Sequence, residues 1–307
     1  MGVTGLGKFL NKYCKESIRV KSLYFYKNKK IVIDINNYLY RFLKKGTLIQ
    51  SLYEFCQLFK YYNIEPIFVF DGIPPEEKMD MILQRQETRS NANKRYEELI
   101  AEYEKTKNED LMKEIKSTKI KTLKLTNNDF RNTKTLLSLL KLKFIIADGE
   151  ADKLCASMVI YNEVYACMTE DNDLFTYGCP RIIRSINMFD HTIIEYELKS
   201  ILKIIGVSNE DFKYLCILNG TEHNNIICNS KTLNESFEFY YENYKNSHHK
   251  TVISFIKNKI SNSNIDKINF IKNIFTLLKK ENYNYKDYST HEHTLETYLK
   301  PFNFIFI

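Results

Sequence analysis

Residues 29–36, KKIVIDIN, carry the pattern from which the fold of this chain is predicted. Two basic residues lead into an apolar, β-branched run that ends in Asp34. Three further segments repeat this design: EPIFVFDG (65–72), KFIIADGE (143–150) and VYACMTED (164–171). The segment RIIRSI (181–186) favours a fifth strand. Each run is apolar throughout rather than alternating, which is typical of a strand that is covered on both faces.

Helical patterns lie between these runs, at residues 51–63, 128–141 and 150–162. Strands that alternate with helices predict an α/β fold with a mainly parallel central sheet flanked by helices. Residues 76–126 are dense in charge and lack Pro and Gly, so we expect a helical cap over the carboxyl edge of the sheet. From about residue 196 the pattern is helical. The sequence therefore predicts a core over residues 1–205 that carries the cap, a helical region over 206–285 and a tail over 286–307.

The overall composition is that of a globular protein with a basic surface. Of 307 residues, 44% are apolar and 27% are charged, and the net charge of +7 favours a polyanionic partner, although Lys-rich proteins reach such values without one. Seven cysteines, an odd number without a C-x-x-C pair, indicate a reducing compartment and no zinc site. No signal-peptide core and no apolar run of membrane-spanning length are present, so we expect a soluble, intracellular protein without membrane contact.

Carboxylates follow four of the predicted strands. Asp34 and Asp71 each end a strand, Asp171 and Asp173 follow another, and Glu150 and Asp152 open the helix after the fourth. A single acid at such a place often serves as a turn or helix cap. In parallel sheets, however, the carboxyl ends of the strands meet at the edge where ligands bind. Acids at four strand ends of a basic chain therefore favour a bound cation.

Six segments resemble the flap endonuclease (XPG-like) family of structure-specific 5′ nucleases. They occur in the order of that family over residues 1 to about 225: MGVTGLGKFL (1–10), IVIDINNYLYRF (31–42), FVFDGIPPEEK (68–78), IADGEADKLCA (146–156), TEDNDLFTYG (169–178) and LCILNGTEHN (215–224). The resemblance implies a PIN-like nuclease core that hydrolyses DNA near single-strand/duplex junctions. It also implies two Mg²⁺ ions, for which Mn²⁺ can substitute.

The resemblance assigns the metal ligands residue by residue: Asp34, Asp71, Glu150, Asp152, Asp171, Asp173 and Glu222. Two of them depart from the family pattern. Asp152 stands where the family has Glu, and Glu222 where it has Asp, so each carboxylate is displaced by about one bond length. Glu170 is expected to point away from the ions, because successive side chains alternate along a strand.

Residues of the cap and of the first strand–helix segment are matched to DNA contacts. Lys78 and Arg85 correspond to a basic pair that holds the scissile phosphate, with solvated helix charges as the alternative. Arg89 continues the same helix face. Tyr40 corresponds to an aromatic residue that stacks on a base, with a core tyrosine as the alternative. Gly2 corresponds to a small second residue that lets the N-terminus approach DNA.

Two features of the family are missing. No Gly-x-Gly turn follows Glu222, so duplex binding through that turn is in question. The tail ends in FNFIFI without the Gln of a clamp-binding box, so we do not expect binding to the sliding clamp. We also expect a monomer. A non-catalytic junction-binding protein and a 5′ ribonuclease stay open as alternatives. Nuclear or cytoplasmic residence also stays open, the latter for a protein of a virus that replicates in the cytoplasm.

Overall fold

The computed structural model describes residues 2–3, 5–221, 237–259, 262–280, 285, 294–302 and 304. The chain divides into two compact units. One consists of Met1–Asn37, Phe55–Ile73 and Leu142–Asp287, and the other of Tyr38–Glu54, Pro74–Lys141 and Tyr288–Ile307. The helices α2 (Ile35–Lys45) and α3 (Leu48–Tyr61) contribute residues to both. The division that the sequence predicts at residues 205 and 285 stays a prediction.

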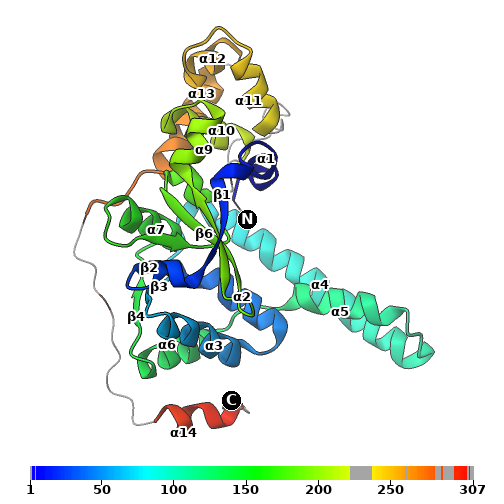
Figure 1. Ribbon diagram of the computed structural model, residues 1–307. Helices are drawn as coiled ribbons and strands as arrows, with labels where there is room; N and C mark the ends of the chain where they lie inside the picture. The colour runs from blue at the N-terminus through cyan, green and yellow to red at the C-terminus, as the bar shows by residue number, and fades with distance from the viewer. Residues whose placement is uncertain are drawn as a thin grey trace. The chain divides into compact units, whose positions relative to one another are not determined.

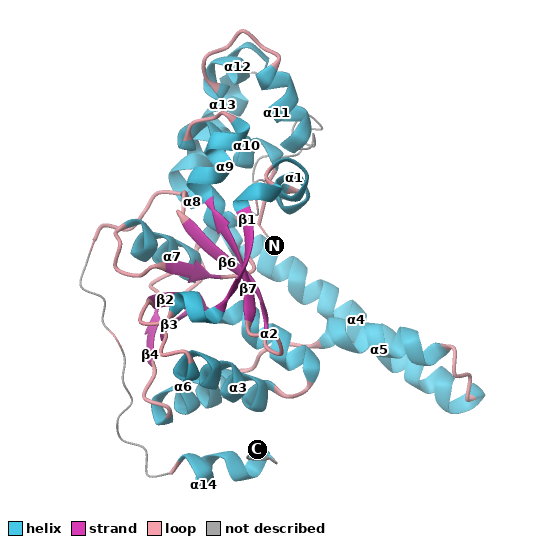
Figure 2. Cartoon of the chain, in the orientation of Figure 1, coloured by secondary structure: helices cyan, strands magenta, loops and turns pink. Residues whose placement is uncertain are grey.

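A twisted sheet forms the centre of the first unit (Figures 1 and 2). Within the described residues it has seven strands in the order β1-β7-β6-β5-β2-β3-β4. Their bounds are β1 (Ile18–Ser22), β2 (Lys30–Asp34), β3 (Glu65–Phe70), β4 (Lys143–Ile146), β5 (Ala166–Met168), β6 (Arg181–Asn187) and β7 (Thr192–Glu197). From β6 through β4 all neighbours pair in parallel, whereas β7 pairs antiparallel with both β6 and β1. The predicted α/β class with a mainly parallel sheet is confirmed.

The parallel strands are buried on both faces, as their continuous apolar runs predict. Val32 in β2, Phe68 in β3 and Cys167 in β5 are all fully buried. Each such side chain contributes about 1.5–3 kcal/mol to folding through its removal from water. A strand of this kind can expose polar groups only at its ends. Because these strands are parallel, acids that follow them lie at one edge of the sheet.

Some helices of the first unit pack on the sheet, and others continue beyond it (Figure 1). They are α1 (Leu6–Tyr13), α7 (Ala151–Ile160), α8 (Asp173–Tyr177), α9 (Leu198–Ile205), α10 (Asn209–Asn219), α11 (Phe237–Lys245), α12 (Val252–Lys259) and α13 (Asn262–Ile274), with short 3₁₀ turns at Lys15–Ser17 and Leu23–Tyr26. The core runs without interruption from Val32 in the sheet to Phe212 in α10 and Phe275 after α13. The N-terminal helix α1 joins it through Phe9, whose ring centroid lies 5.2 Å from that of Tyr241.

Two strands differ from the sequence prediction. Residues 195–197 were expected to begin a helix, but they end β7, and the helix α9 begins at Leu198. The strand β1 was not predicted. Both strands depend on tertiary contacts, because the buried carboxylate of Glu195 accepts hydrogen bonds from Lys21 Nζ and Tyr26 Oη, each at 2.5 Å. Such distant partners leave no local sequence pattern.

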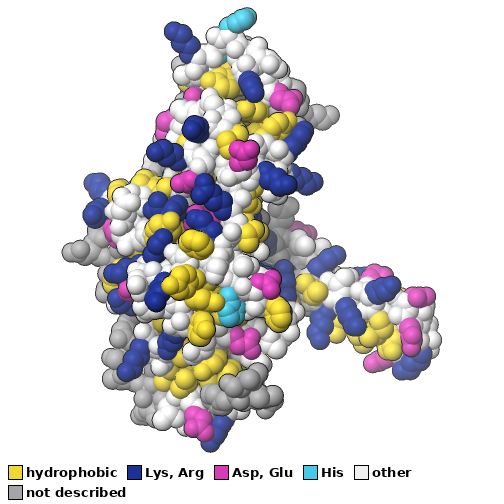
Figure 3. Space-filling view, in the orientation of Figure 1, with side chains coloured by type: hydrophobic (Ala, Val, Ile, Leu, Met, Phe, Trp, Pro, Cys, Tyr) yellow, Lys and Arg dark blue, Asp and Glu magenta, His cyan; other side chains and the backbone are white. Residues whose placement is uncertain are grey.

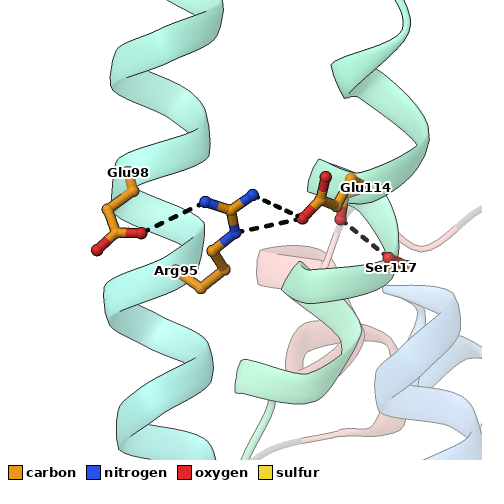
Figure 4. A network of polar contacts seen from close by, with 4 residues as sticks. All are labelled: Arg95, Glu98, Glu114 and Ser117. Atoms are coloured by element: carbon orange, nitrogen blue, oxygen red, sulfur yellow. Dashed lines mark hydrogen bonds and ion pairs between the residues drawn. The ribbon is translucent and has the colours of Figure 1, made fainter.

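The second unit contains the charged segment 76–126, which is helical as predicted and forms a hairpin of α4 and α5. Its elements outside α2 and α3 are a 3₁₀ turn at Glu76–Lys78, α4 (Met79–Thr106), α5 (Leu111–Thr122), α6 (Asn127–Leu139), α14 (Leu295–Leu299) and a 3₁₀ turn at Lys300–Phe302. In the hairpin, Leu99 of α4 and Ile115 of α5 are buried. On its surface Arg95 Nη2 lies 2.9 Å from Glu114 Oε1 on the other helix (Figure 4). The placement of this cap over the sheet stays a prediction.

The C-terminal segment packs on helices of the second unit. Leu299 is fully buried, and Tyr298 Oη donates a hydrogen bond of 2.9 Å to the carbonyl of Asn132 in α6. The ring of Phe304 lies 4.7 Å from that of Tyr53 in α3. Across the described chain, no helix is both long enough and apolar enough to pass through a membrane.

We predict that the α4–α5 hairpin depends on its apolar seam and not on its ion pairs. Leu99→Ala removes a fully buried side chain and should destabilise the protein by about 2–5 kcal/mol. Arg95→Ala breaks exposed contacts to Glu114 and Glu98 and should change stability little. Hydrogen exchange of the α4 and α5 amides would measure both. Equal loss of protection in the two variants would contradict the prediction.

Candidate active site

Acidic residues meet at the carboxyl edge of the sheet in the first unit. Asp34 is the last residue of β2, and Asp71 directly follows β3. Glu150 is the N-cap of α7 after β4, and Asp152 lies in the first turn of that helix. Asp171 and Asp173 follow β5, and Asp173 begins α8. Because β5, β2, β3 and β4 are parallel neighbours, all these ends share one edge.

Asp34 is buried and is held by neutral donors. Its Oδ2 accepts hydrogen bonds from Asn37 Nδ2 at 2.6 Å and from Thr169 Oγ1 at 3.0 Å. Thr169 Oγ1 also accepts the backbone N–H of Asp171 at 3.1 Å, so one hydroxyl joins the end of β2 to the loop after β5. Burial, together with the nearby Asp71 carboxylate, raises the pKa of Asp34 to about 7.

Asp71 connects β3 with the start of α7. Its Oδ1 accepts the backbone N–H of Ala151, the first residue of that helix, at 2.8 Å, and its Oδ2 accepts a hydrogen bond from Asn36 Nδ2. The next residue, Gly72, allows a close approach of the two loops. A Cβ at this position would lie 1.9 Å from the carbonyl oxygen of Ala147. The local sequence Asp-Gly therefore supplies both the acid and the space that it needs.

Asp152 has a buried carboxylate oxygen that could bind a cation. Its Oδ1 is buried and makes no hydrogen bond within the described residues. Burial, and then the carboxylates of Asp171, Asp34, Asp173 and Asp71, raise the pKa of Asp152 well above its usual value. Since a carboxylate influences another group strongly only at short range, these acids form one electrostatic cluster.

Tyr177 at the end of α8 belongs to the surroundings of this cluster, although the sequence did not identify it. It is buried, and its pKa is raised well above the usual value by burial and then by the carboxylates of Asp152 and Glu150. This effect also associates Glu150 with the cluster. Tyr177 lies one helical turn after Asp173, a spacing that could have indicated it.

Asp171 and Asp173 lie in a tight loop against the N-terminal segment. The backbone N–H of Asp173 donates to Asp171 Oδ1 at 3.0 Å. Gly2, with φ +79°, sits so close that an added Cβ would lie 2.1 Å from the same Oδ1. Glu170 Oε1 accepts the backbone N–H of Ser185 in β6 at 3.1 Å, and its orientation relative to bound ions stays a prediction.

The residues fit a divalent cation by their chemistry. Six carboxylates and no thiolate or imidazole are the donor set that Mg²⁺ prefers, and Asp152 Oδ1 is a buried oxygen without a partner. In the described part of the chain, however, no group of three or more His, Cys, Asp or Glu side chains is arranged to hold an ion. The fit therefore depends on the donor set and on the clustered charge, and not on a preformed cage.

Comparison with known proteins agrees with this geometry. Residues 1–92 match the XPG N-terminal domain, and residues 141–222 match the XPG I-region. The flap endonuclease 1 of Encephalitozoon cuniculi is 30% identical over 241 residues, which cover 73% of this chain and 68% of that protein. This chain belongs to the flap endonuclease/XPG family. The fold is also that of the catalytic core of Rad2 in complex with a DNA substrate, with a TM-score of 0.62 and 20% identity over 98% of this chain and 94% of that one.

The match to the family does not extend over whole relatives. The flap endonuclease 1 of sheep (Ovis aries) is 30% identical over 242 residues, which cover 73% of this chain but 62% of the relative. The chain thus spans less than two thirds of that family member. Activity, substrates and partners are therefore treated as proposals below.

The remaining candidate residues of the family pattern lie in the second unit or outside the described residues. Lys78 ends the 3₁₀ turn before α4, and Arg85 and Arg89 lie on α4, with Arg85 exposed. Tyr40 on α2 is 36% exposed, so it is not a core tyrosine. Glu222 lies outside the described residues, so its assignment as a ligand stays a prediction.

We predict that this protein, in the absence of divalent cations, loses stability as the pH rises from 3.8 to about 7. These are the usual aspartate pKa and the pKa of Asp34 in the folded protein. In this range the folded protein retains a proton on Asp34 that the unfolded chain has released, so deprotonation favours unfolding. Asp34→Asn should flatten this decline and raise stability at neutral pH. Urea unfolding in EDTA at about pH 5 and about pH 8 would measure it. An identical pH dependence of the two proteins would contradict the prediction.

We predict that Gly2, but not Gly5, is needed for an intact acidic loop. Both residues have positive φ, so an alanine at either should cost roughly 1–2 kcal/mol. Only at position 2 would the added Cβ collide with Asp171, since nothing lies within 4 Å of a Cβ at Gly5. Gly2→Ala should therefore reduce the increase in melting temperature on addition of Mg²⁺, and Gly5→Ala should preserve it. Equal responses would show that the N-terminal segment does not restrain the loop.

Proposed function

We propose that this protein is a metal-dependent 5′ nuclease that hydrolyses phosphodiester bonds near single-strand/duplex junctions of flapped or branched DNA. The observation that carries the proposal is the cluster of carboxylates at the carboxyl edge, in which Asp34 and Asp152 have raised pKa values. Such concentrated negative charge is costly unless a cation offsets it. Membership of the flap endonuclease/XPG family supports the same chemistry.

The metal would be held by residues of the first unit. We assign this role to the carboxylates Asp34, Asp71, Glu150, Asp152, Asp171, Asp173 and Glu222. Two Mg²⁺ ions, or Mn²⁺ in their place, would supply an activated water and stabilise charge on the attacking and leaving oxygens. The neutral donors Asn37, Thr169 and Asn36 orient Asp34 and Asp71 without cancelling their charge. Tyr177 and the apolar core beneath the cluster restrict water on that side.

Residues of the second unit would act on the DNA. We assign Lys78 and Arg85 to the scissile phosphate, where a cation offsets charge that develops in the transition state. Tyr40 is exposed, as stacking on a base requires, and Arg89 would contact the backbone of the same strand. Gly2 would allow the N-terminal segment to approach the DNA beside Asp171.

Basic helices of the first unit would bind the duplex. Lys and Arg side chains are spread over the visible face of the α9–α13 group (Figure 3). We propose that basic helices such as those within residues 250–280 take the place of the missing glycine turn after Glu222. Contacts of this kind depend strongly on salt. The protein would act as a monomer without a sliding clamp.

We predict that flap cleavage requires Mg²⁺ and the acids of the loop after β5. A 5′-labelled flap duplex should be cut near its junction in Mg²⁺ but not in EDTA. The Asp171→Asn/Asp173→Asn protein should lose at least about 10²-fold in rate, because the metal loses two ligands. Glu65→Gln is a suitable control, since Glu65 begins β3 at the end opposite Asp71 and pairs with Lys143 at 2.9 Å. This variant should cleave normally.

Substrate controls separate the alternatives. Metal-independent junction binding without cleavage would favour a non-catalytic junction-binding protein. Cleavage of RNA and not of DNA would overturn the substrate assignment but retain the metal site. Cleavage that survives loss of both Asp171 and Asp173 would refute the proposed site itself.

A further inference from the structure

The strand β6 has an irregularity directly beside the acidic loop. In its pairing with β7, Arg184 lies opposite Ile194 and Ile186 lies opposite Ile193, so Ser185 is an extra residue. Ser185 has φ +56°, a conformation that residues other than glycine rarely adopt. This β-bulge directs the Ser185 N–H to Glu170 Oε1 at 3.1 Å. Bulges often occur next to active sites, where they redirect a side chain.

The residue before the bulge binds the same loop with its side chain. Arg184 Nη2 donates to the carbonyl oxygen of Glu170 at 2.8 Å, and Arg184 Nη1 donates to Asn172 Oδ1 at 2.6 Å. The guanidinium lies 5.9 Å from the Tyr196 ring centroid. The planar guanidinium of Arg184 thus binds one acceptor on each side of Asp171, in Glu170 and in Asn172.

Asn172 carries this restraint to the acids and to the N-terminal segment. It stands between Asp171 and Asp173, and its Nδ2 donates to the carbonyl oxygen of Val3 at 3.4 Å. The acceptors of Arg184 are a carbonyl and an amide oxygen, so these two hydrogen bonds fix the geometry of the loop without using a carboxylate as acceptor.

We infer that Arg184 is a positioning residue that sets the spacing of Asp171 and Asp173 for the metal. The inference rests on the proposed function, because it assumes that these acids bind a divalent cation. In this role Arg184 acts through its hydrogen bonds to Glu170 and Asn172, and no contact of its own with the metal or the substrate is required. Partners that orient ligands in this way typically change metal affinity or activity by about 10- to 100-fold when they are lost.

A matched residue on the same strand provides the control. Arg181 is half-buried like Arg184 and donates from Nε to the carbonyl oxygen of Tyr165 at 2.6 Å, near the start of β5. Lysine in either position keeps the charge but cannot donate to two acceptors in a fixed geometry. The two variants therefore have the same charge. Arg184→Lys affects the loop after β5, whereas Arg181→Lys affects the chain near the start of β5.

The experiment measures Mn²⁺ binding by the full chain without DNA, with electron paramagnetic resonance to detect free Mn²⁺. We expect Arg184→Lys to weaken binding by about 10- to 100-fold, while Arg181→Lys binds like the unaltered protein. Melting curves in EDTA should show that both variants remain folded. In Mg²⁺-dependent flap cleavage, Arg184→Lys should raise the metal concentration that gives half-maximal rate.

A double-mutant cycle tests the pathway through Asn172. Asn172→Ala removes the acceptor of Arg184 Nη1, so its effect on Mn²⁺ affinity should not add to that of Arg184→Lys. Additive effects, or Mn²⁺ binding by Arg184→Lys that equals that of Arg181→Lys, would overturn the inference and leave the proposed function standing. If the unaltered protein neither binds Mn²⁺ nor cleaves DNA, the proposed function fails and the inference fails with it.

Discussion

Repulsion among carboxylates at one edge of a sheet is the constraint on which this structure depends. A parallel sheet buried on both faces brings the ends of β2, β3, β4 and β5 together, and acids follow each of them. The donors that hold Asp34 and Asp71 are two side-chain amides, a hydroxyl and a backbone N–H, all of them neutral. Neutral donors fix the positions of the oxygens but leave their charge. The edge is therefore rigid and still strongly attractive to cations.

The antiparallel part of the sheet supports this edge from the side. The strands β6, β7 and β1 do not end in the acidic cluster, but β6 carries the bulge at Ser185 and the guanidinium of Arg184. The N-terminal segment contacts the same loop through Val3 and Gly2. Elements that contribute no carboxylate to the cluster thus contact the loop that carries Asp171 and Asp173.

The sequence was sufficient for the parts of the molecule that are encoded locally. Apolar runs that end in acids identified β2 through β5, a further apolar run identified β6, and the charge pattern identified the helices α4 and α5; the role of the six carboxylates stays a prediction. The strands β1 and β7 were missed or misplaced because the buried Glu195 that joins them finds its partners at Lys21 and Tyr26. Tyr177 and Arg184 were missed for the same reason. Their importance comes from proximity in space, and an aromatic residue or an arginine in an apolar segment has no special pattern by itself.

The contact between Val3 and Asn172 has a consequence for the order of folding. These residues are 169 positions apart, and Thr169 and Asp34, which share another hydrogen bond of the site, are 135 apart. Contacts of such long range form late, because the chain must first lose the entropy of closing a large loop. During synthesis the N-terminal segment leaves the ribosome first, yet it can reach its place only after the loop at Asn172 has been made. A chain that is released before Asp173 would therefore lack part of the acidic cluster, so the cluster can be complete only after more than half of the 307 residues have been made.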